Sequence, residues 1–525
     1  MKRSRPTLSA HSTAGLKALS VQSNRELTRG RCEFQKRWPV GFRKFWAVEF
    51  EVREVLLPLG RQLLTNGFAL LALRATNDDL HARGLERSDI TLRTDADYWQ
   101  TVNTSLGKVT FPLCAYRDRS GPVAVTRTPA RLGPFAHHDG CKSSHVLLEW
   151  ECRLGSEFPF RRADEALTFF SHGAAQVEDT TIARHLVRVG SLIDRQWLYR
   201  PVPELRELLS KRATRDTETG EPIIYASSDA HALRRYVDET WDAQWKMANG
   251  VRLWCIDRFT GSTIHIGGEY TWGDCNEVGA IFAELIKSGH LPIDGDYGKG
   301  LKSKLVFVTD GAEWLETHIL NQFPKAVAII DAYHVMERLA TYANERFGRG
   351  TPPAKQFYEG SLEALFGPRP KANPKTKPRQ GTKRRQTKSR KSTPSEPFTS
   401  TAGGDALLAF ITKNAVDQKA PDLQEAERHR ILVGFLSVRS AKLNYPRFKH
   451  LGYQIGSGAM ESLHRTGSQC RLKIPGGRWL EATSQAIFNF RMMLLSGRWA
   501  SFWNQQGLPC LITRAFVPQV AKDAA

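Results

Sequence analysis

Three acidic residues lie in segments whose spacing could bring their carboxylates together. Asp229 ends the apolar run PIIYASSD, Asp310 directly follows the run LVFVT, and Glu461 lies in IGSGAMES, where two glycines indicate the start of a helix. Hard divalent cations prefer oxygen ligands, and two of them can hold both the attacking and the leaving oxygen of a phosphodiester. Two carboxylates at strand ends and a glutamate on a later helix would provide such a site, so we expect metal-dependent phosphoryl transfer.

A second signature, DAYH, follows the apolar run that comes after Asp310. Asp331 stands where a helix is expected to open, and a helix-capping role for it stays open. His334, three residues on, would point toward the same sheet edge as Asp310, where it could position a phosphate or hold Asp331 in place. For Asp310 itself, Gly311 allows an immediate turn that leaves the carboxylate at the sheet edge. A solvent-facing turn is the alternative.

The first acid has a rival in Asp257. That residue leads into RFTG, which is typical of a hairpin turn, whereas Asp229 ends the strand expected to be central. We therefore prefer Asp229. Asp294 and Asp296 lie in a loop rich in Gly and Asp, and we expect them to be turn residues rather than ligands.

The helix that carries Glu461 also carries cationic residues. Arg465 and Ser468 share its face at helical spacing, and Arg471 and Lys473 follow closely. Because Arg and Lys suit contacts to DNA phosphates, Arg465, Arg471 and Lys473 are candidate DNA-binding residues. A lone glutamate near a helix N-terminus commonly only offsets the helix dipole, and that alternative stays open for Glu461.

The elements around these acids predict an α/β catalytic core. Between about residues 221 and 334, three strand-like runs joined by short turns precede a helix, a strand, a helix, a strand and another helix. The order βββαβαβα belongs to an RNase H-like mixed sheet, in which the first and fourth strands lie adjacent and parallel. Such pairing would bring the residues at their ends together.

A helical insertion is expected to interrupt this core at residues 335–455. It contains the segment 368–397, which has 11 Lys and Arg residues, one Glu and six Pro. We expect this segment to be disordered, because proline opposes helix and like charges repel. It is either a tether that clamps DNA or a solvated loop that adds only non-specific affinity. Residues 456–525 would supply the catalytic helix and a helical tail.

The amino-terminal part predicts DNA recognition. Residues 1–94 are expected to be mainly helical, 95–155 to form a small β-rich module, and 156–200 to form a helix-turn-helix. The second helix of that motif, with DTT at 179–181 as its N-cap, would expose side chains suited to base edges and phosphates. An ordinary helical hairpin with a basic face is the alternative. The candidate DNA-binding residues here are Thr181, Arg184, His185 and Arg188.

The composition points to a polyanionic partner. The chain of 525 residues is long enough for several domains, and its net charge of +21 favours nucleic acid over a membrane surface. We find no run of about 18 apolar residues and no apolar segment after the basic N-terminus, so we expect no membrane association, no secretory signal and a cytoplasmic location. The eight cysteines form no C-x-x-C pair and are expected to be reduced. Zinc binding by Cys141 and Cys152 with His137 and His138 stays open, although their spacing fits no standard finger.

Together these motifs resemble those of a known family. The strand-D-G-x-x-W order at Asp310, D-x-x-H at Asp331, I-G-S-G-x-x-E ending at Glu461, and the downstream RLK and RW sequences look like prokaryotic insertion-sequence transposases. The resemblance is to the DDE superfamily in its Mutator-like branch, within the Kra-type insertion-sequence group, and covers about residues 221–499. Two features depart from the pattern. Ala230 stands where members often have Gly, and the scattered cysteines do not reproduce the metal-binding pairs of some relatives.

The resemblance implies a DNA transposase that acts as an endonuclease at element ends and transfers the strands into target DNA. Asp229, Asp310 and Glu461 match the family's metal-binding triad, with two Mg²⁺ ions for which Mn²⁺ can substitute, and Asp331 and His334 match its accessory motif. It further implies double-stranded DNA with terminal inverted repeats as the partner, a homodimer or higher assembly, and a location at the bacterial nucleoid. An RNase H-like nuclease or resolvase without strand transfer, and an inactive DNA-binding descendant, are alternatives. The basic excess disfavours an enzyme outside nucleic-acid chemistry.

Overall fold

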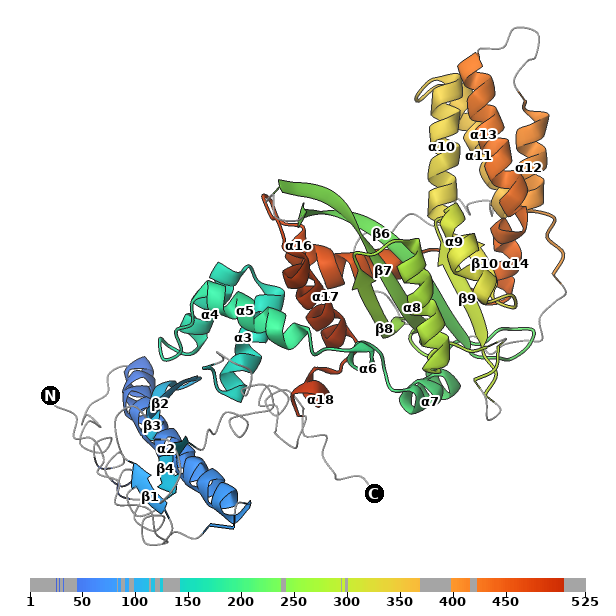
Figure 1. Ribbon diagram of the computed structural model, residues 1–525. Helices are drawn as coiled ribbons and strands as arrows, with labels where there is room; N and C mark the ends of the chain where they lie inside the picture. Colours follow the sequence, from blue (N-terminus) through green and yellow to red (C-terminus); the bar gives the residue numbers. More distant parts are fainter. Residues whose placement is uncertain are drawn as a thin grey trace. The chain divides into compact units, whose positions relative to one another are not determined.

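The computed structural model divides the chain into two compact units, residues Met1–Leu192 with Trp499–Ala525 and residues Ile193–Arg498 (Figure 1). The described residues are 45–82, 84–85, 90–93, 99–112, 115–118, 123–125, 142–237, 242–293, 295–297, 301–368, 398–415 and 423–504, with Arg25, Thr28 and Cys32. The expected basic linker lies outside these residues from 369 to 397. Asp294 also lies outside them, as do His137, His138 and Cys141, for which zinc binding was left as an alternative.

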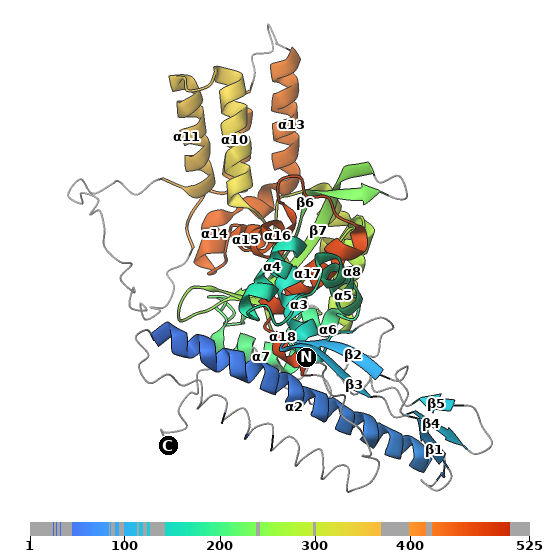
Figure 2. The ribbon, with the colours of Figure 1, turned by 90° about the vertical axis from the view of Figure 1, so that its left-hand side faces the viewer.

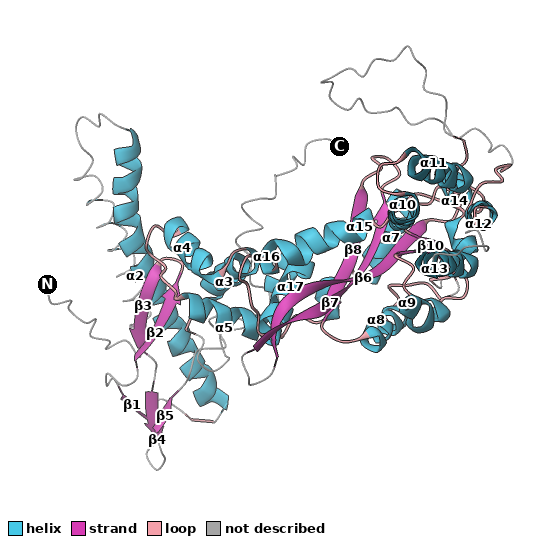
Figure 3. Ribbon diagram, turned by 90° about the horizontal axis from the view of Figure 1, so that it is seen from above, coloured by secondary structure: helices cyan, strands magenta, loops and turns pink. Residues whose placement is uncertain are grey.

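The unit Ile193–Arg498 is built on a mixed five-stranded sheet (Figures 1 and 3). Its strands are β6 (Ile223–Val237), β7 (Asp242–Ile256), β8 (Thr263–Thr271), β9 (Lys304–Thr309) and β10 (Val327–Ile330). They lie in the order β10-β9-β6-β7-β8, with β6, β7 and β8 antiparallel and β6, β9 and β10 parallel. The predicted adjacent, parallel pairing of the first and fourth strands is therefore confirmed.

The strand that contains Asp229 is longer than the sequence predicted. Asp229 was expected to end a strand, but β6 continues to Val237 because β7 supplies antiparallel partners along that length. The parallel partner β9 stops much earlier, since the last β6–β9 pair joins Ala226 and Phe307. Asp229 therefore lies just beyond the parallel part of the sheet, at the base of the arm formed by β6 and β7.

Helices pack on this sheet through alternating side chains of its strands. The ring of Phe282 on α8 (Cys275–Lys287) lies 5.6 Å from that of Phe307 on β9. The valines on either side of Phe307 point the opposite way, because successive strand residues face opposite sides, and they join the core with α10 (Ala332–Phe347). The remaining helices outside the insertion are α6 (Arg195–Leu198), α7 (Val202–Arg212), α9 (Glu313–His318), α15 (Gly458–Leu463), α16 (Cys470–Leu472) and α17 (Glu481–Leu495).

A group of helices lies between β10 and the segment of Glu461, where the helical insertion was predicted. After α10 come α11 (Pro352–Phe366), α12 (Gly404–Lys413), α13 (Leu423–Arg439) and α14 (Tyr445–His450). Aromatic side chains pack α10, α11 and α12 together, since the ring centroid of Phe357 on α11 lies 5.5 Å from those of both Tyr342 on α10 and Phe410 on α12. Figures 1 and 2 show α10, α11 and α13 side by side.

The other unit combines a long helix, two small sheets and shorter helices. α2 (Phe45–Ala82) packs against a hairpin, with Phe68 5.3 Å from Phe111. The hairpin strands are β2 (Trp99–Thr104) and β3 (Gly107–Pro112), and a second antiparallel sheet contains β1 (Ile90–Arg93), β4 (Ala115–Asp118) and β5 (Val123–Val125). Its other helices are α3 (His145–Glu157), α4 (Phe160–Phe170), α5 (Asp179–Gly190) and α18 (Trp499–Trp503).

Among the described residues, one helical segment is a candidate for spanning a membrane, which the search for an unbroken apolar run did not detect. By length and composition alone, Val52–Ala72 within α2 is long and apolar enough to do so. Part of this segment is in a protein core, because Ala69 and Ala72 are buried against Val109 and Phe111. Core helices pass the same test, so this segment is weak evidence for a membrane.

Candidate active site

Asp229 and Asp310 lie toward the same end of two neighbouring parallel strands. The parallel register of β6 and β9 pairs Ala226 with Phe307. Asp229 follows this pair by three residues within β6, and Asp310 follows it by three residues, directly after the end of β9. Two of the predicted metal ligands are thus brought to the same edge of the sheet.

Asp331 continues this row on the next strand. The register of β9 and β10 pairs Thr309 with Ile330, and one residue further it reaches Asp310 and Asp331. The N–H of Asp331 donates to the carbonyl of Thr309 at 2.7 Å, so the alignment extends past the last pair. Three aspartates therefore stand in a row across the ends of the parallel strands.

The chain turns immediately after Asp310. Gly311 has a φ of 83°, in the left-handed region that favours glycine. The N–H of Ala312 donates to Asp310 Oδ1 at 3.0 Å, and Nε of Arg439 on α13 donates to the Gly311 carbonyl at 3.1 Å. The turn is thus held both locally and by the helical insertion.

Asp331 is buried and its carboxylate is hydrogen-bonded at both oxygens. One oxygen accepts from the N–H of Tyr333 at 2.6 Å, and the other accepts from the N–H of Ser457 at 2.9 Å and from the Ser457 hydroxyl. Nδ1 of His334 lies 3.4 Å from the second oxygen. Burial alone would raise the pKa of Asp331, but these donors outweigh it and lower the pKa to about 2. Asp331 therefore caps α10 and joins it to the segment that precedes Glu461.

His334 is half-exposed beside the row of aspartates. Its hydrogen bond with Asp331 raises its pKa against the opposing effect of burial, and the charges of Asp331, Asp310 and Asp229 raise it further. His334 therefore keeps its proton to a higher pH than an isolated histidine. When protonated, it adds positive charge beside the three aspartates.

Asp229 is held at both of its carboxylate oxygens. The N–H of Ala230 donates to Oδ1 at 2.7 Å, and Nε2 of His464 lies 3.3 Å from Oδ2. Burial alone would raise the pKa of Asp229, but His464, the Ala230 N–H and the charge of His334 together lower it. The side chain is ionised at neutral pH and 41% exposed, so a ligand can reach it.

Asp257, the rival to Asp229, lies at the opposite edge of the sheet. It follows the end of β7, which runs antiparallel to β6. Its buried carboxylate accepts from the N–H of Phe259 at 3.0 Å and pairs with Arg212. Asp257 therefore shapes the predicted hairpin turn, and the geometry favours Asp229 as the partner of Asp310.

Glu461 is exposed in the first turn of α15, which packs against β6 and β7. Among the residues that the structure describes, no group of three or more His, Cys, Asp or Glu side chains is arranged to hold a metal ion. The two aspartates and Glu461 thus do not form an assembled metal centre. Of the three predicted ligands, Asp229 and Asp310 are the two that lie toward the same end of the parallel strands.

His464 contacts Asp229 although it was not among the predicted residues. It begins a π-helical segment, His464–Gln469, three residues after Glu461. Ser468, expected to share the exposed face of Glu461, is buried instead and binds His231 at 2.7 Å. The sequence signal was a histidine three residues after the glutamate, but a π-helical turn cannot be deduced from residue spacing.

The prediction that Arg471 binds DNA is wrong. Its side chain is fully buried, its guanidinium lies 4.8 Å from the ring centroid of Trp479, and burial lowers its pKa to about 10. The π-helical segment changes the helix phase before Arg471, so regular α-helical spacing misplaces it. Arg465 and Lys473 are exposed, as the prediction requires.

Two helices, α4 and α5, lie where the helix-turn-helix was predicted at 156–200, and α3 packs with them. α3 begins at His145, so the end of the range 95–155 is helical and the prediction of a β-rich module was wrong there. α3, α4 and α5 share a core that includes Leu147, Leu167 and Ile182. The turn after α4 contains Gly173, as expected, with a φ of 78°. The N-cap of α5 is Glu178, immediately before the expected DTT sequence.

The prediction that His185 binds DNA is also wrong. Its side chain is buried, and Nδ1 lies 2.5 Å from Oε2 of Glu151 on α3. Arg184 is exposed and donates to Oγ1 of Thr181 at 2.9 Å, and Arg188 is half-buried. Of the candidate DNA-binding residues on α5, Arg184 is the one that is exposed.

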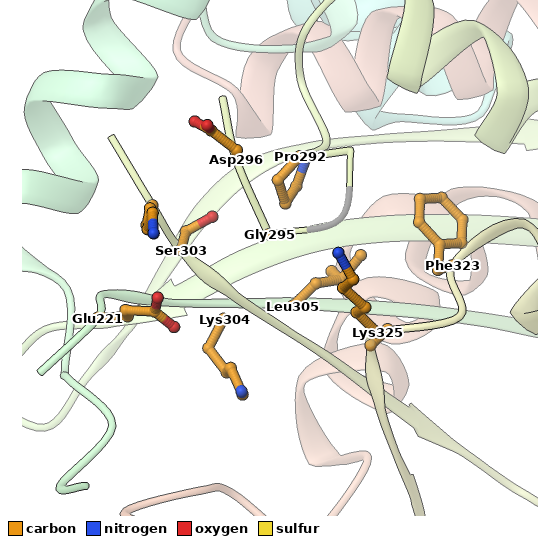
Figure 4. Close-up of a pocket in the computed structure, with 11 residues that line it drawn as sticks. Glu221, Pro292, Gly295, Asp296, Ser303, Lys304, Leu305, Phe323 and Lys325 are labelled. Carbon is orange, nitrogen blue, oxygen red and sulfur yellow. The ribbon is translucent and has the colours of Figure 1, made fainter. Parts of the chain in front are cut away.

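A cavity of about 180 Å³ lies away from these residues (Figure 4). Lys304 and Leu305, at the start of β9, contribute to its lining, whereas Asp310 follows the end of the same strand. The cavity is therefore at the opposite edge of the sheet and is not part of the candidate active site. Asp296 also lines the cavity. Its backbone forms isolated β-bridges with Ile293 and Lys302 in a turn.

Comparisons with known proteins give no family assignment. No protein-family model matches the chain, and no curated protein matches it. Among solved structures, the Drosophila P element transposase strand transfer complex is similar with a TM-score of 0.29 and 11% identity, over 71% of this chain and 96% of that chain. This TM-score is too low to identify a shared fold, so the strand order and the site residues have to support any functional conclusion.

Proposed function

We propose that the protein is a DNA transposase of the DDE type, which cleaves DNA at the ends of an insertion sequence and transfers the freed strands into target DNA. The observation that carries this proposal is the position of Asp229 and Asp310 toward the same end of neighbouring parallel strands. One carboxylate is accessible and ionised, and both lie at the edge where α/β sheets place their reactive groups.

The topology supports an RNase H-like core for this activity. Counted along the chain, the five strands of the sheet lie in the order 5-4-1-2-3, with the fourth and fifth parallel to the first. This is the arrangement expected from the order βββαβαβα. Helices α10 to α14 then lie between the fifth strand and Glu461, as an insertion into such a core would.

The chain's own residues give each part of the site a role. Asp229 and Asp310 would hold Mg²⁺, for which Mn²⁺ can substitute, and α15 carries Glu461 as the third candidate ligand. Bound Mg²⁺ supplies charge that activates the attacking oxygen and stabilises the leaving oxygen of a phosphodiester. Asp331 fixes the start of α10 beside these ligands, and protonated His334 offers positive charge to the scissile phosphate.

Charge and exposure support double-stranded DNA as the partner. The net charge of +21 favours a polyanion, and Arg184, Arg465 and Lys473 are exposed cations. We propose that α3, α4 and α5 recognise the terminal inverted repeats, with target DNA bound at the aspartates. Processing of two ends together calls for a homodimer or higher assembly, acting at the nucleoid of a bacterial cytoplasm.

An inactive DNA-binding descendant is the second candidate. It is favoured by one observation, that the described acidic side chains form no group of three around a metal position. An RNase H-like nuclease or resolvase would use the same aspartates but would not join DNA ends. Cleavage and joining must therefore be measured separately.

The deciding experiment is a cleavage and joining assay on a plasmid that carries the gene's flanking DNA, in Mg²⁺ and in Mn²⁺. The wild type is compared with Asp310→Asn and with Asp296→Asn, an exposed aspartate at the opposite sheet edge. We expect joined products from the wild type and from Asp296→Asn, and none from Asp310→Asn.

Each other outcome excludes one interpretation. Products that persist in Asp310→Asn would place the active site elsewhere. Cleavage without joining would indicate a nuclease or resolvase. Binding to the flanking DNA without cleavage in either metal would support the inactive descendant.

A further inference from the structure

A buried chain of polar contacts ends on the carboxylate of Asp229. The hydroxyl of Tyr270 on β8 lies 2.9 Å from Nδ1 of His464, and Nε2 of His464 lies 3.3 Å from Oδ2 of Asp229. Tyr270 is 2% exposed and His464 is 4% exposed, whereas the side chain of Asp229 is 41% exposed. The chain thus runs from the protein interior to a carboxylate that solvent reaches.

Close packing restricts the imidazole of His464 to one place. Its ring centroid lies 4.5 Å from that of His231, which in turn binds Ser468. Gly250, the cross-strand partner of Asp229, leaves space for this packing, because a Cβ at that position would lie 2.7 Å from the ring of Tyr270 and 3.2 Å from the imidazole of His464. The ring is therefore confined by both the sheet and its own helical segment.

The chemistry of the three groups sets the direction of these hydrogen bonds. A carboxylate group that binds a cation can only accept, so the Nε2 of His464 that faces Asp229 is the nitrogen placed to donate. In a neutral imidazole Nδ1 is then an acceptor, and the Tyr270 hydroxyl donates to it. Burial raises the pKa of Tyr270 well above its ordinary value, so the hydroxyl keeps its proton. Tyr270 thereby selects the tautomer of His464 that can hold Asp229.

We propose that His464 is a positioning residue, which together with the Ala230 N–H fixes the carboxylate of Asp229 in the orientation that receives a ligand beside Asp310. The inference rests on the proposed function, in which Asp229 holds a metal ion. Groups that orient metal ligands in this way affect metal affinity and activity without touching the metal. The positioning role of His464 also gives the π-helical segment a function, because that segment begins at His464 and such segments are frequent at functional sites.

Two substitutions of His464 that place an amide donor at different positions test this role. In His464→Gln the amide nitrogen can reach the position of Nε2 and keep the contact with Asp229, whereas in His464→Asn it reaches only the position of Nδ1, next to Tyr270. His290→Gln is the matched control, because His290 is also buried, at 8%, but contacts the carbonyl of Arg200. The measurements are kcat and KM for DNA-end joining, the half-saturating Mg²⁺ concentration and the thermal unfolding midpoint.

We expect His464→Asn to lower kcat and to raise the half-saturating Mg²⁺ concentration, each by about 10- to 100-fold, with KM for DNA unchanged. His464→Gln should recover most of the activity, and Tyr270→Phe should fall between the two. Wild-type activity in His464→Asn would overturn the positioning role. Equal losses in the Asn and Gln variants would overturn it too, because a purely structural role does not distinguish the two donors.

Failure of the proposed function gives a different pattern. In that case the wild type and Asp310→Asn are both inactive on DNA. Calorimetric titration of the same His464 variants with Mn²⁺ alone then decides the positioning role. Weaker binding in His464→Asn than in His464→Gln supports it, and equal binding overturns it.

Discussion

Both hydrogen-bond donors of Ser457 bind the same carboxylate oxygen of Asp331, which lies 126 residues earlier in the chain. A second contact joins the same two segments, since the N–H of Ala332 donates to the carbonyl of Ile455 at 3.0 Å. Helices α10 to α14 lie between these two points. The insertion therefore begins and ends at one place beside Asp310, and α15 is held at the sheet whatever the length of the chain between.

The contacts of Asp331 predict a pH-dependent contribution to stability. Its pKa of about 2 is below the ordinary value of 3.8, so the folded state binds this proton less tightly than the unfolded state. The stabilisation is thus fully present above pH of about 4 and is lost as the pH falls toward about 2. We expect Asp331→Asn, which keeps the side-chain shape, to lower the free energy of unfolding at neutral pH by about 2 kcal/mol.

Urea denaturation of the wild type and Asp331→Asn at several pH values checks this expectation. The difference between the two proteins should shrink as the pH falls below about 4. Asp296→Asn, in an exposed turn, is the control and should change little. A difference that stays constant down to the lowest pH at which the proteins fold would show that the charge of Asp331 does not stabilise the fold.

Local sequence signals were sufficient for the order of strands and helices along the chain and for the local structure at two of the aspartates. Asp310 follows a short apolar run and precedes Gly311, and the structure places the turn there. Asp331 follows the next apolar run, and it does cap a helix. Both features depend only on residues that are close in sequence, so the local sequence pattern is enough to predict them.

Features that depend on distant contacts could not be predicted in the same way. The extension of β6 beyond Asp229 requires its pairing with β7, and the burial of Arg471 follows from the π-helical segment before it. The burial of His185 is different, because a signal for it was present. His185 lies with Ile182, Leu186 and Val189 on the buried stripe of α5, at the spacing of an apolar helix face.

Substitutions at neighbouring positions of α5 should separate stability from DNA binding. His185→Ala removes the buried partner of Glu151 and should lower the free energy of unfolding by about 1–3 kcal/mol. Arg184→Ala removes an exposed cation, so it should change stability by less than about 0.5 kcal/mol. It should weaken binding to the flanking DNA and reduce the magnitude of the salt-dependence slope by about one. Chemical denaturation and fluorescence-anisotropy titrations in several salt concentrations measure both effects. Unchanged DNA affinity in Arg184→Ala would remove α5 from the DNA interface.

Arg471 and Lys473, in the unit that contains the aspartates, also allow an effect on stability to be separated from an effect on DNA binding. The guanidinium of Arg471 is stacked on Trp479 in the interior, so Arg471→Ala should lower the free energy of unfolding by about 2 kcal/mol through lost packing and cation–π attraction. Lys473 is exposed, and Lys473→Ala should leave stability nearly unchanged while weakening DNA binding uniformly across sequences.

Arg471→Lys is the control for this pair, since it keeps the charge but not the planar group that stacks on the indole. It should destabilise the protein nearly as much as Arg471→Ala, whereas a charge contact with DNA would be largely retained. A stable Arg471→Ala variant that binds DNA weakly would contradict the buried position of this side chain. The buried position predicts that Arg471→Ala loses stability, and that its DNA affinity equals that of the wild type when the two are compared at the same fraction of folded protein.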